Sequence, residues 1–93
     1  MLRVVVDKSV SAALAKLGPD AQSEMLGELR RLPGVFGLPY VHAGLGIRQL
    51  RPGVYEARVG LKIRVVFERA GDLLVVKTVG DHADIRRYLR NRT

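Results

Sequence analysis

The second half of this chain reads as a series of short β-strands, and this pattern constrains the fold more than any other feature. Four runs carry the apolar and β-branched residues of strands: Ile47–Arg51, Val54–Val59, Lys62–Glu68 and Leu73–Val79. The segments between these runs are short and include the turn-forming pairs Pro52-Gly53 and Gly71-Asp72. Because short turns join antiparallel neighbours, the sequence predicts a meander of antiparallel strands.

The first half is predicted to be mainly helical. It begins with a short β-branched strand at Leu2–Val6, after which Asp7 or Ser9 can cap a helix that runs to about Leu17. Gly18 is expected to end this helix in the left-handed conformation that follows many helices, and the proline after it cannot continue the helix.

A second helix is predicted from Asp20 to Leu32, with Pro33-Gly34 as its end. Its apolar face consists of Ala21, Met25, Leu29 and Leu32. The segment from Pro33 to Gly46 holds four glycines, two prolines and no Lys or Arg, so it is predicted to be a loop. With 93 residues, the chain is expected to form one α+β domain over residues 1–93: a strand, an αα-hairpin, an antiparallel meander and a short C-terminal helix.

The central hairpin has a predicted register. A three-residue loop, Val59-Gly60-Leu61, places Arg58 opposite Lys62 and Glu56 opposite Arg64, with Gly60 in the left-handed conformation. This register keeps one face apolar, formed by Tyr55, Ala57, Val59, Ile63, Val65 and Phe67. It also leaves Arg58 and Lys62 as adjacent like charges, which is unfavourable unless an anion lies between them.

The positive charge is concentrated in the second half. Lys and Arg total 16 against 9 Asp and Glu, a net charge of +7. Residues 1–45 hold five cations and four acids, and residues 46–93 hold eleven cations and five acids, so the halves carry +1 and +6. Such a surface favours nucleic acid as a partner, although it also promotes solubility and suits an acidic protein.

Other features narrow the function classes. The absence of cysteine excludes disulfides, Cys-based metal sites and a thiol nucleophile. No apolar run approaches the roughly 20 residues of a membrane span, and the N-terminus lacks a secretory signal pattern, so a cytoplasmic location is expected. His42 and His82 are far apart in sequence, and only Asp84 lies at ligand spacing from either, which argues against a metal centre. His42 has no identifiable partner.

The C-terminal helix has a clear start signal. Asp81 is a candidate N-cap and Asp84 lies in the first turn, so a helix is predicted at Ala83–Arg90 directly after the last strand. His82 falls at the helix start, where exposed N–H groups favour anions. A histidine that is neutral near pH 7 is a competent general base.

The order of elements, together with the segments Y-E-A-R-V-G-L-K-I-R-V-V-F and V-G-D-H-A-D-I-R-R-Y, resembles the RelE/ParE superfamily of bacterial toxin components. The resemblance covers nearly the whole chain, and its second half is the specific part. It implies a RelE-like fold. RelE-like toxins are endoribonucleases that require no metal or cofactor; they enter the ribosomal A site and cut mRNA, using the 2′-hydroxyl of the RNA as nucleophile.

The resemblance also implies roles for individual residues. Arg64 would stabilise phosphate charge, His82 would act as base or acid, and Tyr88 would stack on a base or orient the 2′-hydroxyl. Each role has a structural alternative, because Arg64 could only pair with Glu56, His82 could only complete the helix start, and the Tyr88 ring could pack on the sheet. Further cations are expected to contact RNA: Arg48, Arg51, Arg58, Lys62, Arg86 and Arg87.

The implied partners are a cognate antitoxin, mRNA and the ribosome. Antitoxins of this superfamily wrap the toxin with an acidic or amphipathic segment, which suits a net charge of +7. The loop from Pro33 to Gly46 lacks the lysines or acids that ribosome-dependent nucleases commonly carry there, so one catalytic contribution is either missing or supplied elsewhere, for example by Arg48 and Arg51. Two other functions stay open: a ParE-like toxin that inhibits DNA gyrase, and a non-catalytic basic module that binds RNA or protein.

Overall fold

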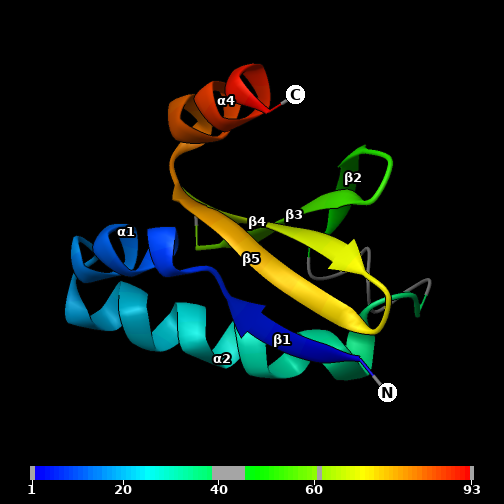
Figure 1. The fold of residues 1–93 in the computed structure, drawn as a ribbon. Helices are drawn as coiled ribbons and strands as arrows, with labels where there is room; N and C mark the ends of the chain where they lie inside the picture. Colours follow the sequence, from blue (N-terminus) through cyan, green and yellow to red (C-terminus); the bar gives the residue numbers. More distant parts are fainter. Residues whose placement is uncertain (1, 39–45, 61, 93) are drawn as a thin grey trace.

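The computed structural model describes residues 2–38, 46–60 and 62–92. Its elements, in chain order, are β1 Arg3–Val6, the 3-10 helix η1 Lys8–Val10, α1 Ser11–Ala15, α2 Pro19–Val35, β2 Arg48–Arg51, β3 Val54–Val59, β4 Ile63–Ala70, β5 Leu73–Gly80 and α4 His82–Asn91. The predicted order of strand, helical hairpin, strands and C-terminal helix is confirmed (Figure 1). None of the described helices has the length and apolar character needed to cross a membrane.

The five strands form one mixed sheet in the order β1-β5-β4-β3-β2. Strands β2 to β5 pair with their sequence neighbours in antiparallel orientation, as the short turns predicted. Strand β1 lies parallel to β5, with Arg3 opposite Leu73 and Val6 opposite Val76. The first and last strands are therefore neighbours, and the end of β5 leads directly into α4.

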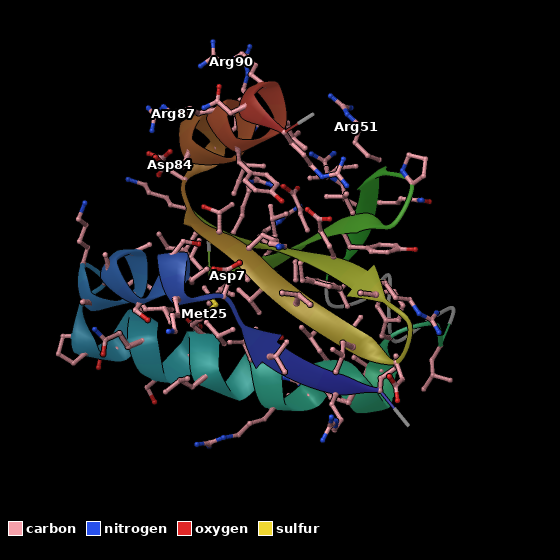
Figure 2. All side chains as sticks on the ribbon, viewed as in Figure 1. Asp7, Met25, Arg51, Asp84, Arg87 and Arg90 are labelled. Carbon is pink, nitrogen blue, oxygen red and sulfur yellow. The ribbon has the colours of Figure 1, made fainter. Side chains whose placement is uncertain are left out.

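The two faces of the sheet are covered unequally (Figure 1). Helices α1 and α2 lie against one face, and the Met25 side chain points from α2 toward the sheet (Figure 2). The main core lies between these layers and consists of Val10, Met25, Leu29, Leu32, Ile47, Ala57, Val59, Val65, Phe67, Leu74, Val76 and Val79. Helix α4 covers only part of the other face, over a small second core of Val54, Val66 and Ile85.

The two N-terminal helices meet at Gly18 differently from the prediction. Asp7 caps η1, because its carboxylate accepts a hydrogen bond from the Ser9 N–H at 3.0 Å. Gly18, however, has φ −64° and is the N-cap of α2, so its predicted left-handed conformation is wrong. Pro19 occupies the first position of α2, where its fixed φ and missing N–H cost nothing. The glycine and proline therefore start the second helix.

The predicted end of α2 at Leu32 is also wrong, because the helix continues through Pro33 to Val35. Near a helix end, a proline removes only one intrahelical hydrogen bond, and the Phe36 N–H still donates to the Leu32 carbonyl at 2.9 Å. Tertiary packing favours the extension, since the Phe36 ring lies edge-on to the Tyr55 and Phe67 rings at centroid distances of 4.8 and 5.8 Å. Residues 39–45 of the predicted loop, including His42, lie outside the described residues.

The β3–β4 hairpin keeps its predicted faces but not its predicted register. Val59 lies opposite Ile63 and Arg58 lies opposite Arg64, so Gly60 and Lys62 belong to the turn and Lys62 is outside the ladder. Gly60 has φ 68°, which confirms the left-handed turn position. The predicted pairing of Arg58 with Lys62 is wrong by two residues; a shift of two preserves which side chains face the core, so the apolar pattern could not distinguish the two registers.

Candidate nucleic-acid interface and catalytic residues

A buried carboxylate organises the sheet face on the α4 side. The Glu56 side chain is 2% exposed, and its Oε1 accepts hydrogen bonds from Arg48 Nε at 2.8 Å and Arg64 Nη1 at 3.0 Å. A buried carboxylate is costly unless it is paired, and charged hydrogen bonds of this length are strong. The predicted Glu56–Arg64 ion pair is confirmed, although the two residues lie diagonally across the strands, because Glu56 is opposite Val66. Glu56 thus fixes the orientation of the Arg64 guanidinium.

Arg58 and Arg64 are neighbouring cations on the same face, and Glu56 pairs with Arg64 but not with Arg58. They lie directly opposite each other across β3 and β4, and Arg58 is exposed. Among residues 2–38, 46–60 and 62–92, no carboxylate forms an ion pair with Arg58. Three arginines (48, 58 and 64) against one Glu56 leave a surplus of two positive charges. Like charges directly opposite each other are unfavourable, so this arrangement favours an anion between them.

Glycines flank this pair of arginines on both sides. Arg64 lies opposite Gly80 of β5, and a Cβ placed on Gly46 would lie 3.4 Å from the Cβ of Arg58. A side chain at position 46 would stand beside the Arg58 side chain, whereas a Cβ at position 80 would meet Asp84. Gly46 therefore leaves room beside Arg58 for a phosphate group, whereas Gly80 is buried.

The start of α4 is fixed by a reciprocal cap. The Asp84 N–H donates to Asp81 Oδ1, and the Asp81 N–H donates to Asp84 Oδ2, each at 3.0 Å. The hydrogen bond from the Asp84 N–H is the largest cause that lowers the pKa of Asp81. A Cβ on Gly80 would lie 2.3 Å from Asp84 Oδ2, so only glycine fits there. The cap therefore makes His82 the first residue of α4. His82 is exposed and follows Gly80, the residue opposite Arg64, by two positions.

Tyr88 belongs to a different network. Its hydroxyl donates a hydrogen bond to Glu68 Oε2, and Arg92 binds both carboxylate oxygens of Glu68, through Nε at 3.0 Å and Nη2 at 3.1 Å. The hydrogen bond from Arg92 is the largest cause that lowers the pKa of Glu68. Burial first, and then the bond to Glu68, raise the pKa of Tyr88 to about 12, so the phenol is protonated at neutral pH. Its ring packs against the second core.

The structure therefore brings only part of the predicted catalytic set together. Arg64 and His82 belong to the same end of the β4–β5 pair. The Tyr88 hydroxyl is held at Glu68, which lies four residues along β4 from Arg64, a backbone distance of about 13 Å at the rise of a strand. Sequence reasoning did not anticipate Glu68 and Arg92 as partners of Tyr88. Glu68 and Arg64 are an even number of positions apart on β4, and this spacing indicates that both side chains lie on the same face of the sheet.

The remaining predicted RNA contacts fall in two places. Arg48 and Arg58 lie on the sheet face described above, and exposed Lys62 lies in the adjacent turn. The others line a hollow of about 470 Å³ between α4 and the end of β2, named the arginine hollow here and formed by Arg51, Ala83, Arg86, Arg87, Leu89 and Arg90. Figure 2 shows Arg87 and Arg90 pointing away from the sheet. Across the described residues there is no cluster of three His, Asp or Glu that could hold a metal ion.

Comparisons with known proteins identify the fold. No protein-family profile matches the sequence, and no curated protein matches it. Solved structures do match. The free E. coli toxin RelE, as a double mutant, superposes with a TM-score of 0.70 at 19% identity, covering 95% of this chain and 90% of that one.

Two further structures agree with this match. The archaeal RelE–RelB complex from Pyrococcus horikoshii gives a TM-score of 0.67 at 21% identity, covering 86% of this chain and 93% of that chain. YafQ from E. coli gives a TM-score of 0.63 at 19% identity, with 91% and 98% covered. The expectation of a RelE-like architecture is confirmed over nearly the full length of all three. The chain therefore has the fold of the RelE toxins.

Proposed function

We propose that this protein is the toxin component of a toxin–antitoxin pair and that it is an endoribonuclease that cleaves mRNA on the ribosome. The observation that carries the proposal is the Arg58–Arg64 pair, which lies at the end of the β4–β5 pair that leads into α4, with Arg58 exposed. The fold adds support, because structures with this fold include toxins in complex with their antitoxins.

The geometry suits cleavage of a phosphodiester by its neighbouring 2′-hydroxyl. A base takes the 2′-OH proton, the 2′-oxygen bonds to phosphorus, the bond from phosphorus to the 5′-oxygen breaks, and an acid protonates that oxygen. The products are a 2′,3′-cyclic phosphate and a 5′-hydroxyl end. Negative charge accumulates on the phosphorane oxygens, and fixed cations at that position supply most of the stabilisation. Arg58 is the free cation, and Arg64 is held in place by Glu56.

His82 is the candidate for proton transfer. It is exposed at the first residue of α4 and follows β5 at the end where Arg64 lies. A general base or acid has to reach the reacting oxygen directly or through one water molecule. An exposed imidazole at this end of β5 meets the requirement of access to a bound RNA strand.

Tyr88 contributes through its ring and through the position of α4. Its hydroxyl is engaged with Glu68, and its raised pKa disfavours loss of the proton. Stacking of the ring on a base is compatible with this bond, because the hydroxyl and the ring face are different parts of the side chain. Residues 82–91 are held against the sheet in part by this contact.

Induction of the chain in a bacterial host, followed by mapping of mRNA 5′ ends, tests the proposal. We expect growth arrest and new 5′-hydroxyl ends with the wild-type chain, and neither with His82→Ala or Arg64→Ala. Coexpression of the protein encoded by the neighbouring reading frame is expected to restore growth. DNA breaks without new mRNA ends would instead indicate a gyrase inhibitor.

Arg30→Ala is the matched control, because Arg30 is exposed on α2 and its loss changes the net charge by the same amount as Arg64→Ala. If arrest and cleavage survive both His82→Ala and Arg64→Ala, the nuclease proposal is wrong, whatever the effect of the control.

A further inference from the structure

The arginine hollow is separate from the Arg58–Arg64 pair and has its own chemistry. Four of its six lining residues are arginines and none is acidic. Three of the arginines come from two consecutive turns of α4, and Arg51 comes from the last position of β2, so two elements that are distant in sequence build the wall. The volume of about 470 Å³ is sufficient for a phosphate group with its sugar.

Most of the charge in the hollow is uncompensated. Arg87 forms an ion pair with Asp84 at 3.2 Å, and Arg51 makes only a long hydrogen bond of 3.4 Å to the Leu50 carbonyl. Within the part of the chain that the structure describes, Arg86 and Arg90 have no ion pair. They are four residues apart on α4, and like charges at that spacing destabilise a helix. An anion that binds between them removes this repulsion.

The lining favours one class of anion. None of the six residues is aromatic, whereas sites for single-stranded nucleic acid usually stack bases on aromatic rings. Only Ala83 and Leu89 are apolar, and protein partners usually need a larger apolar centre. Double-helical RNA presents its phosphates outward and is recognised through shape and backbone contacts, without exposed base faces.

We propose that the arginine hollow binds the phosphate backbone of a double-helical RNA segment, independently of its sequence. Arg86 and Arg90 contact phosphates from α4, and Arg51 contacts the same duplex from the β2 end. The inference deepens the proposed function, because it names a second contact with the RNA target, away from the strand that is cut. Binding at this site does not require cleavage, so the two proposals can fail separately.

Fluorescence anisotropy with a short RNA duplex tests the site. The duplex carries 2′-O-methyl groups, so it cannot be cleaved, and a single strand of the same length serves as a second probe. We expect Arg86→Gln/Arg90→Gln to weaken duplex binding and to reduce the slope of log K against log salt by about 2, one unit for each lost phosphate contact. Binding of the single strand is expected to change less. Glutamine preserves helix propensity, so α4 is retained.

Arg3→Gln/Arg30→Gln is the matched control, because both arginines are exposed and lie outside the hollow. Their substitution lowers the net charge by the same amount as Arg86→Gln/Arg90→Gln. Arg51→Gln, which lies outside any helix, provides an independent variant and is expected to reduce the slope by about 1.

Three results of the RNA-binding measurements would overturn the proposal: equal loss of duplex binding in the control, equal loss of single-strand binding in the hollow variants, or an unchanged slope in all hollow variants. In a last experiment, an acidic peptide with the same net charge as the RNA duplex competes with the duplex for binding. If the hollow variants weaken binding of that peptide more than binding of the duplex, the surface is a site for an acidic protein and not for RNA.

Discussion

The two ends of the sheet face under α4 use the same residue types for opposite purposes. At one end, Glu68 neutralises Arg92 and receives the Tyr88 hydroxyl, so every group is engaged and the helix is held to the sheet. At the other end, Glu56 neutralises one charge while Arg48, Arg58 and Arg64 supply three. The first end is complete by itself, whereas the second is left with positive charge. Along β4, the proposed RNA contacts are therefore separate from the contacts that anchor α4.

The largest expected effect is on activity at the charged end. Arg58→Ala removes the free cation, and we expect mRNA cleavage to fall by about 10²- to 10³-fold, the usual cost of one group that stabilises the transition state. Thermal stability is expected to be unchanged or slightly higher, because a like-charge pair is relieved. Single-turnover cleavage and thermal melting measure the two effects, with Arg30→Ala as control. A variant that cleaves at the wild-type rate would remove Arg58 from the site.

Glu56→Ala tests whether the charged end is held together by its carboxylate. We expect a loss of about 1–3 kcal/mol in the free energy of unfolding, because two guanidinium groups lose their shared acceptor. The loss is below that of a fully buried ion pair, since the Arg48 side chain is 62% exposed and that of Arg64 is 22% exposed. Urea denaturation measures it. Glu28→Ala, which removes a surface ion pair with Arg31, should cost less than about 0.5 kcal/mol.

Tyr88→Phe sharpens the comparison at the anchored end. The ring stays in place and the hydrogen bond to Glu68 is lost, so we expect a decrease of about 1 kcal/mol in unfolding free energy. Cleavage is expected to change by only a few-fold. If cleavage is abolished while stability is unchanged, the hydroxyl takes part in proton transfer and the separation of the two ends is wrong.

The smallest expected effects concern pH. Because the pKa of Glu68 is lowered, its contribution to stability is present above the ordinary value of 4.5 and is lost as pH falls through the folded value. Because the pKa of Tyr88 is raised to about 12, its contribution is present below pH 10 and is lost as pH rises from 10 to 12. Unfolding curves at pH 3 to 7 for the wild type, Glu68→Gln and the exposed control Glu24→Gln test the acidic effect.

The alkaline effect has a separate measurement. Absorbance titration of the phenols from pH 9 to 13 should show a late transition of Tyr88 in the wild type that is missing in Tyr88→Phe. A Tyr88 transition near pH 10 would mean that its bond to Glu68 is not maintained in solution.

Local features of the site were predictable because they depend on few neighbouring residues. Asp81 and Asp84 are three positions apart, which is the spacing of a reciprocal cap, and the start of α4 follows from them. The left-handed turn at Gly60 is likewise a property of a short segment. Features that involve distant residues were predicted less well. The hairpin register and the partner of Tyr88 depend on contacts that residue spacing does not record.

The sequence by itself determined the antiparallel meander, the face of the sheet that each residue occupies, the cap of the last helix and the excess of positive charge, because each depends on local periodicity or composition. Only the tertiary structure decided which cations have an acidic partner and which do not. Burial of Glu56 neutralises part of the charge of Arg48 and Arg64, and the register sets Arg58 beside Arg64. It also decided that Tyr88 anchors α4 through Glu68. A charge is compensated by what lies within a few ångströms of it, and those neighbours come from several strands and a helix brought together by folding.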